Sequence, residues 1–105
     1  MPEQLTITVP VAKVLAALLG DPDGDHYGLA LIKATGLPSG TLYPILLRLE
    51  RAGWVRSTWE DIDPARAHRP ARRYYRFTGD GATRARAGLA RLRAQTRPVT
   101  TPRWA

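Results

Sequence analysis

Few side chains in this sequence have the types and spacing that catalysis requires. His26 and His68 are the two histidines, and both fall in polar segments next to charged residues. A nucleophilic triad needs a base oriented by a carboxylate beside a nucleophile, and no such set is marked here. Asp61 and Asp63 could form a carboxylate pair, but flanking arginines favour exposed ion pairs. Since a glycine-rich phosphate loop is also missing, we expect neither an enzyme nor a bound cofactor.

A metal site is also not expected. Asp21, Asp23 and Asp25 have the alternating spacing of a calcium loop. Such a loop needs glycine at its sixth position and glutamate at its twelfth, and counting from Asp21 these are His26 and Ile32. The chain has no cysteine, which excludes disulfides and thiolate metal sites. We therefore predict a turn whose aspartates cap the next helix.

Residues 37–55, LPSGTLYPILLRLERAGWV, carry groups suited to binding. Hydroxyls at Ser39, Thr41 and Tyr43 can donate to phosphates or meet base edges. Gly40 would let the backbone approach DNA closely, and a helix N-terminus favours an anion. This segment is typical of a helix that enters the major groove by its N-terminal end. The residues that we expect to contact DNA are Ser39, Gly40, Thr41, Tyr43, Pro44, Leu47 and Arg48.

The net charge of +7 is unevenly distributed. Residues 1–47 hold two lysines and four acids, whereas residues 48–105 hold 14 arginines and five acids. A basic half attracts a polyanion such as nucleic acid or an acidic membrane surface. Five arginines and no acids lie between Arg66 and Arg76, which favours double-stranded DNA. From this segment and the helix before the recognition helix, we expect DNA contacts from Tyr27, Lys33, Arg66, Arg69, Arg72 and Arg73.

Hydrophobic periodicity predicts the elements that position these residues. Helices are expected over 9–19, over 26–35, from a cap at Ser39 or Thr41 to a stop at Gly53, and over about 80–95 after a Thr78 cap. Strands are expected over 54–60 and 72–78, joined by a polar link with a flexible tip. The predicted fold class is mainly α with a small β-hairpin, a winged helix-turn-helix (α-α-α-β-β-α). Residues 1–78 would bind DNA, 79–95 would dimerise, and 96–105 would be a flexible tail.

The expected core uses one face of each element. Strand alternation pairs Val55 with Trp59 and Tyr75 with Phe77, and we expect these four side chains and Trp54 to point inward. In the last helix, apolar residues repeat at heptad spacing, at Ala82, Ala85, Leu89 and Leu92. No apolar stretch approaches the roughly 20 residues of a membrane helix, and the N-terminus lacks a signal-peptide core. We expect a soluble cytoplasmic protein.

Three stretches together resemble the PadR family of winged-helix transcriptional regulators. HYGLAL is similar to the family's second-helix motif, LPSGTLYPILLRLERAGW to its recognition helix, and RRYYRFTGDG to the segment that closes its wing. The resemblance spans about residues 8–92. The short link between the second and third helices also makes the chain similar to MarR- or ArsR-type domains. The part after the wing is one helix and a tail, without a large effector domain.

The resemblance implies a homodimer that binds a pseudo-palindromic operator and acts as a repressor. It also implies that the first and last helices form the dimer contact, here through Val11, Leu15, Leu18, Ala82, Ala85, Leu89 and Leu92. Some members respond to phenolic compounds or hydrophobic drugs near that contact. A small apolar effector is therefore one interpretation of these residues, and simple packing is the other. Two alternatives to DNA binding stay open, namely an adaptor that kept only the winged fold and an RNA-associated basic protein.

Overall fold

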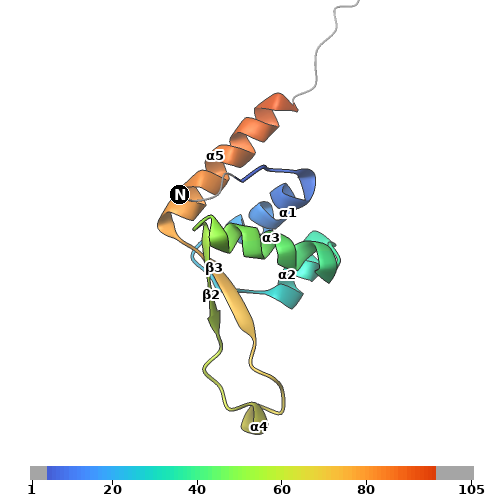
Figure 1. Cartoon of the computed structure of the whole chain (residues 1–105), viewed down its shortest axis with the longest axis vertical. Coiled ribbons are helices and arrows are strands. Elements are labelled where there is room, and N and C mark those ends of the chain that lie inside the picture. Colours follow the sequence, from blue (N-terminus) through green and yellow to red (C-terminus); the bar gives the residue numbers. More distant parts are fainter. Residues whose placement is uncertain (1–4, 97–105) are drawn as a thin grey trace, which may run out of the picture.

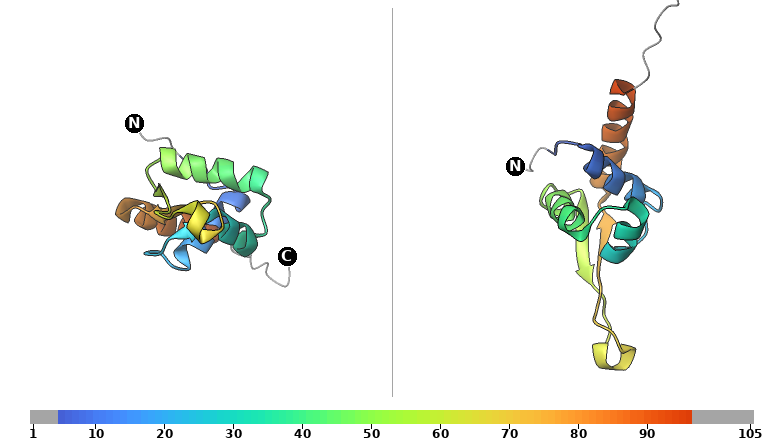
Figure 2. Two further views of the ribbon diagram at one scale, coloured as in Figure 1. Left: turned by 90° about the horizontal axis from the view of Figure 1, so that it is seen from below. Right: turned by 90° about the vertical axis from the view of Figure 1, so that its right-hand side faces the viewer.

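A computed structural model of the chain describes residues 5–96. In chain order its elements are α1 (Val9–Leu19), β1 (His26–Tyr27), α2 (Gly28–Thr35), α3 (Ser39–Arg51), β2 (Val55–Trp59), α4 (Pro64–Ala67), β3 (Arg73–Phe77) and α5 (Gly79–Gln95). Helices α1, α2 and α3 form the body, from which the β2–β3 hairpin and α5 extend in opposite directions (Figures 1 and 2). The tail predicted over 96–105 lies, beyond Thr96, outside the described residues.

Threonine side chains cap the first and last long helices, as their sequences predict. The Val11 amide donates to Thr8 Oγ1 over 3.4 Å at the start of α1. The Gly81 amide donates to Thr78 Oγ1 over 2.9 Å at the start of α5. The Thr78 hydroxyl also donates to the Gly53 carbonyl over 2.8 Å. Because this second bond spans the turn after α3, the same side chain starts α5 and ties it to the hairpin base.

The helix predicted over 26–35 begins two residues later than expected. His26 and Tyr27 form β1, which pairs antiparallel with β3 opposite Tyr75 and Tyr74. The sheet order is β1-β3-β2, so β3 is the central strand. A two-residue strand has too few positions for an alternating pattern, and the partner strand lies far along the chain. Only the tertiary pairing therefore separates β1 from α2.

Helix α3 begins differently from either predicted cap. Its N-cap is Pro38, whose carbonyl accepts from the Thr41 and Leu42 amides, each at 3.0 Å. Ser39 is therefore the first helical residue, and Pro44 lies beyond the first turn. The predicted caps Ser39 and Thr41 are wrong, because the change from extended to helical backbone occurs one residue earlier, at Pro38, whose ψ is 155°. Gly53, at φ 78°, follows the helix end as predicted.

One core unites the three body helices with the hairpin base. Its members include Leu31 of α2, Trp54, and the inward residues of the strands, Val55, Tyr75 and Phe77. From α1 and α3 it takes Val14, Leu42, Ile45, Leu46 and Leu49. These positions confirm the predicted inward faces with one exception. Trp59 is 61% exposed, because β2 carries it past the helical body even though it shares a strand face with Val55.

Four of the seven residues expected at a dimer contact lie in this same core. Val11 is 1% exposed, and Leu15, Leu18 and Ala85 are fully buried within the single chain. They therefore cannot line a surface that contacts a second copy, and this part of the expectation is wrong. The heptad spacing of α5 instead serves packing between α5 and α1. Ala82, Leu89 and Leu92 are only partly buried.

The hairpin link contains a short helix, and an ion pair of 2.6 Å between Arg69 Nη1 and Glu60 Oε1 joins its two ends. Strands β2 and β3 pair from Val55 opposite Phe77 to Trp59 opposite Arg73. Beyond them lies α4, whose N-cap Asp63 accepts from the Ala65 amide over 3.0 Å. The polar link predicted between the two strands therefore contains a short helical turn. No helix within residues 5–96 has the length and apolar character to cross a membrane.

Candidate nucleic-acid interface

The outer face of α3 presents nearly all of the residues expected to contact DNA. Because Leu42, Ile45, Leu46 and Leu49 face the core, the helix turns its other side outward. Thr41 is half-buried at the edge of that side. The exposed members of the expected set are Ser39, Gly40, Tyr43, Pro44, Leu47 and Arg48. One helical surface therefore gathers hydroxyl, apolar and guanidinium groups.

The N-termini of α2 and α3 differ from those of the other described helices. In α1, α4 and α5 a side chain of the N-cap residue accepts a hydrogen bond from the first turn. The N-caps of α2 and α3 are Tyr27 and Pro38, and neither makes such a side-chain bond. The first amides of a helix need an acceptor from outside it, and their partial positive charge suits an anion. The amides at these two helix starts can therefore donate hydrogen bonds to a phosphate oxygen.

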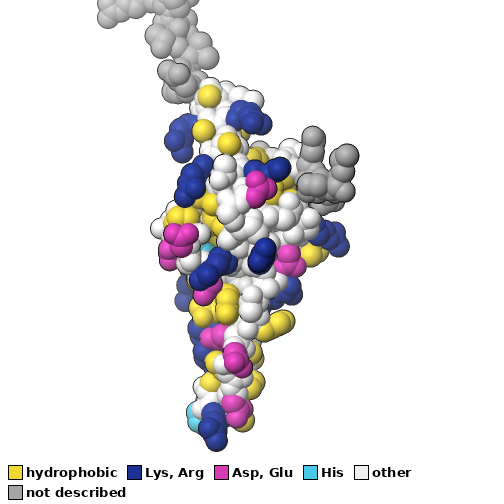
Figure 3. All heavy atoms as spheres, turned by 90° about the vertical axis from the view of Figure 1, so that its left-hand side faces the viewer, with side chains coloured by type: hydrophobic (Ala, Val, Ile, Leu, Met, Phe, Trp, Pro, Cys, Tyr) yellow, Lys and Arg dark blue, Asp and Glu magenta, His cyan; other side chains and the backbone are white. Residues whose placement is uncertain are grey.

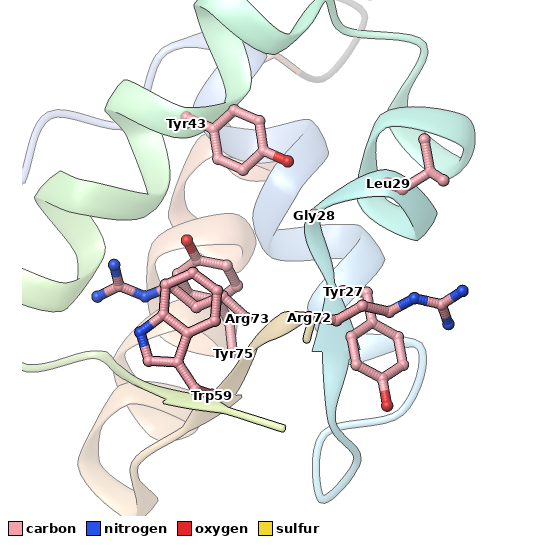
Figure 4. A pocket seen from close by; sticks show the side chains of 8 residues that line it. All are labelled: Tyr27, Gly28, Leu29, Tyr43, Trp59, Arg72, Arg73 and Tyr75. Atoms are coloured by element: carbon pink, nitrogen blue, oxygen red, sulfur yellow. The ribbon is translucent and has the colours of Figure 1, made fainter. Parts of the chain in front are cut away.

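A cleft of about 460 Å³ separates α3 from the wing (Figure 4). Its lining is largely aromatic and basic, from Tyr27, Gly28, Leu29, Tyr43, Trp59, Arg72, Arg73 and Tyr75. The hydroxyl of Tyr43 points from α3 toward the start of α2, and the hydroxyl of Tyr75 points up toward α3 (Figure 4). The cleft thus joins the recognition helix, the start of α2 and the wing in one continuous surface.

Tyr43 reaches this position because residue 28 has no side chain. A Cβ at residue 28 would lie 2.7 Å from Cε1 and 2.8 Å from Cζ of the Tyr43 ring. These distances are well inside van der Waals contact, so any larger residue would displace the ring. Gly28 therefore sets where the Tyr43 hydroxyl lies relative to the N-terminus of α2.

Acidic side chains neutralise much of the wing's arginine cluster. Arg69 Nη1 donates to Glu60 Oε1 over 2.6 Å, and its Nη2 donates to Oε2 over 3.0 Å. Arg76 lies 3.0 Å from Asp25. Arg69, which we expect to contact DNA, is therefore held by a carboxylate nine residues earlier in the chain, and its contact with DNA stays a prediction. Basic and acidic side chains are interspersed along the wing face in Figure 3.

Arg73 belongs to a network that links the wing to α3. Its Nη2 donates to Ser57 Oγ over 2.6 Å and lies 3.4 Å from Glu50 Oε1. The Ser57 hydroxyl in turn donates to Glu50 Oε2. Glu50 lies in the last turn of α3, so the network fixes the hairpin relative to the recognition helix. Arg73 keeps 43% of its side chain exposed, which leaves it in reach of solvent beside the cleft.

The other basic residues predicted to contact DNA are less restrained by acidic side chains. Arg72 lies over the Tyr27 ring at 5.3 Å from its centroid, at the mouth of the cleft. Arg66 is 91% exposed and only 3.9 Å from Asp63, a weak surface pair. Lys33 is exposed in the last turn of α2 and does not line the cleft. Of the wing arginines predicted to touch DNA, Arg66 and Arg72 are those with the most freedom to do so.

Comparison with protein-family models matches residues 14–87 to the PadR-like family of transcriptional regulators. The chain belongs to this family. Its members are regulators rather than enzymes, which agrees with the sequence argument against catalysis. Family membership also implies that this PadR-like chain binds DNA. Comparison with curated proteins gives no match.

Solved structures agree with this assignment. A PadR family regulator from Eggerthella lenta is 26% identical, with a TM-score of 0.65 over 83% of this chain and 78% of that one. A PadR family regulator from Clostridium difficile gives a TM-score of 0.67 at 20% identity, over 84% of this chain and 91% of that one. A MarR family regulator from Silicibacter pomeroyi gives 0.58 at 25% identity, over 84% and 56%. The winged fold is therefore shared by PadR and MarR structures.

The pKa values of three groups in the PadR-like wing are shifted by local contacts. The paired hydrogen bonds from Arg69 lower the pKa of the Glu60 carboxyl to about 2, and the same bonds raise the pKa of Arg69. The Arg72 amide also donates to Glu60 Oε1 over 3.0 Å. Burial raises the pKa of the Tyr75 hydroxyl. Glu60 therefore stays ionised and joins the two ends of the link between β2 and β3 through Arg69 and Arg72.

Several residues of the PadR-like surface were not among those expected from sequence. Trp59 was assigned to the core, and Gly28 and Leu29 were read only as part of a helix motif. Glu50 and Ser57 matter because they anchor Arg73 across 23 and 16 residues of chain. The sequence signal for Trp59 was its place at the far end of a strand, where coverage by helices ends. No comparable feature of the sequence predicts the contacts of Gly28 and Glu50.

Proposed function

We propose that this PadR-like regulator is a repressor that binds a pseudo-palindromic operator as a homodimer in the cytoplasm. The observation that carries the proposal is the continuity of the outer face of α3 with the cleft beside the wing. Helix α3 would enter the major groove with its N-terminal half, where Ser39, Gly40 and Tyr43 are exposed. The wing would then follow the adjacent minor groove.

The cleft suits the sugar-phosphate strand that separates those two grooves. It lies between the element proposed for the major groove and the element proposed for the minor groove (Figure 4). Arg72 at its mouth supplies a guanidinium, which can grip a phosphate through two N–H groups. The Tyr43 hydroxyl and the first amides of α2 add neutral donors. Phosphate contacts of this kind fix the register of the protein on the duplex.

A second copy of the chain would pack on a groove between α1 and α5. This groove, of about 420 Å³, is lined by Val9, Ala12, Lys13, Ala16, Leu89, Leu92, Arg93 and Thr96. Val9 is 65% exposed, so an apolar side chain is available at the edge of this groove for a partner to cover. A two-fold dimer would present two recognition helices about 34–36 Å apart, one turn of DNA, and would therefore select an inverted repeat. A small apolar effector would act by binding in this groove.

Selection of bound fragments from a random DNA pool tests the proposal directly. We expect enrichment of an inverted repeat, and protection of both half-sites in a footprint. Affinity for that repeat should fall steeply as salt rises, because each phosphate contact releases counterions. If no sequence is enriched and fragments are not retained, the chain is an adaptor with a winged fold. Enrichment of RNA over duplex DNA would instead favour the RNA-associated alternative.

A further inference from the structure

The centre of the outer face of α3 is a row of residues without hydrogen-bonding side chains. Gly40, Pro44 and Leu47 are spaced by four and three positions, so they lie on one line along the helix. All three are exposed, and Leu47 shows 47% of its surface. We call this row the apolar stripe. It lies opposite the buried face formed by Leu42, Ile45, Leu46 and Leu49, and therefore on the side of α3 that would face the base edges.

Between Ser39 and Arg48 the polar side chains lie beside the stripe, and Arg51 continues its line at the end of α3. Tyr43 turns toward the cleft and the start of α2 (Figure 4). Arg48 is exposed on the other flank. The amide side chains that read adenine are missing from α3, since the chain contains no asparagine and its two glutamines are Gln4 and Gln95. The stripe itself can therefore contact base edges only through apolar groups and its backbone.

The fold itself does not require residues without polar side chains in the stripe. A Cβ at residue 40 would meet nothing within 4 Å, and the Gly40 backbone does not have the positive φ that demands glycine. Glycine weakens a helix relative to alanine. Pro44 also lacks the amide that would bond to the Gly40 carbonyl. Two helix-weakening residues thus stand side by side on the exposed surface, where both keep the helix free of protruding polar groups.

The major groove offers one apolar group, the 5-methyl of thymine. We propose that α3 recognises thymine methyl groups through Leu47 and Pro44, with Gly40 allowing the helix to approach the base edges. This inference rests on the proposed function, because it names the feature of the operator that the same helix reads. It makes Leu47 the main specificity-determining residue of the stripe. Arg48 and Arg72 strengthen binding without selecting thymine.

The expected size of the effect follows from the transfer of one methyl group out of water. Burying a single carbon group of this kind changes affinity by about fourfold. Replacing thymine by deoxyuridine removes this methyl and leaves Watson–Crick pairing and every hydrogen-bonding group of the base pair unchanged. The substitution therefore measures apolar contact alone.

The test uses the full chain and the inverted repeat obtained by selection. Each thymine of one half-site is replaced singly by deoxyuridine, and the dissociation constant is measured by fluorescence anisotropy. We expect a loss of about fourfold at one or two positions and no change at the others. If every position tolerates deoxyuridine, the stripe does not read methyl groups. The selected repeat would in that case still support the proposed function.

Variants assign the sensitive position to the stripe. In Leu47→Ala, the ratio of affinities for the thymine and deoxyuridine duplexes should fall to about one, because the contacting side chain has gone. Leu29→Ala removes another exposed leucine, which lines the cleft on α2; whatever its effect on overall affinity, the ratio for the two duplexes should stay at the wild-type value, because the cleft faces the backbone and not the base. Arg48→Ala should weaken binding to both duplexes equally. A fourfold preference for thymine that persists in Leu47→Ala would overturn the assignment.

A complementary measurement restores a methyl on a different base. At the sensitive position, a 5-methylcytosine·guanine pair should bind more tightly than an unmodified cytosine·guanine pair by a similar factor of about four. Equal affinities for the two duplexes would mean that the preference for thymine depends on its hydrogen-bonding groups instead. Circular dichroism melting of each variant checks that the fold is retained.

Discussion

The Tyr43 ring lies against the backbone of Gly28, so the recognition helix and the start of α2 meet through one aromatic side chain. A Cβ at residue 28 would come within 2.8 Å of the ring carbon Cζ. Gly28 lies at the first position of α2 and not at a positive φ. Its role is therefore to make room for the ring, and not to allow an unusual backbone.

This relationship predicts that Gly28→Ala weakens DNA binding without unfolding the chain. The ring must swing aside, and alanine is a better helix residue than glycine, so the melting temperature should change little. Operator affinity should fall several-fold because the Tyr43 hydroxyl leaves its place. Tyr43→Ala should lower affinity by a similar amount. In the double variant the two losses should not add, and full additivity would show that Gly28 acts independently of Tyr43.

Arg72 and Arg84 carry the same charge but should differ in their effect on salt dependence. If Arg72 holds a phosphate, Arg72→Ala should reduce the slope of log affinity against log salt by about 0.9. Arg84 lies on α5, where it pairs with Asp80 at 2.8 Å, so Arg84→Ala should leave the slope unchanged. The slopes can be measured by anisotropy titrations at several salt concentrations. Equal slopes for the two variants would remove Arg72 from the interface.

An acidic residue in the groove between α1 and α5 should separate the proposed dimer. Val9→Asp suits this test because residue 9 is exposed and an acid is favourable at a helix start. Sedimentation should show monomers at concentrations where the wild type is a dimer. Operator affinity should fall as the dimer is lost. Ala87→Asp adds the same charge on an exposed part of α5 outside the groove. A dimer that survives Val9→Asp would place the contact elsewhere.

The Glu60–Arg69 pair predicts a titration at unusually low pH. A carboxyl whose pKa is lowered on folding stabilises the native wing above its unfolded value of 4.5, and this contribution is lost as pH falls through about 2. The carbon-13 shift of the Glu60 carboxyl should therefore have a midpoint near 2. Arg69→Ala should return the midpoint toward 4.5, the ordinary value. Arg66→Ala, which removes a weakly paired arginine from the same wing, should not.

Substitution by alanine should have opposite effects on the free energy of unfolding at two glycines of α5. At residue 81 a Cβ would lie 2.6 Å from the Trp54 Cα and closer still to its carbonyl, and backbone cannot rotate away as a side chain can. Gly81→Ala should therefore lower the free energy of unfolding by at least about 2 kcal/mol. At residue 79 a Cβ meets nothing within 4 Å, so Gly79→Ala should be neutral or slightly stabilising. Urea denaturation of the two variants gives the comparison.

Much of the local structure follows from the sequence alone. The periodicity of α1 and α3 shows which side of each helix is apolar. It did not show that the apolar side of α1 packs inside one chain, since Val11, Leu15 and Leu18 were expected at a dimer contact. The threonine caps, the stop at Gly53 and the two main strands follow from equally local chemistry. The exposed face of α3 was also predictable, since it is simply the side opposite the leucines.

Tertiary structure decided the features that depend on distant partners. It gave β1 its pairing with β3, carried Trp59 beyond the helical body, and buried Leu15 and Ala85 in one chain rather than between two. It also paired Arg69 and Arg76 with acids, so the cluster that looked wholly basic in sequence is partly neutralised. The spacing of apolar residues in a helix or strand indicates which side of the element is apolar. What covers that side, and which charge meets another, is fixed only when segments far apart in sequence are brought together.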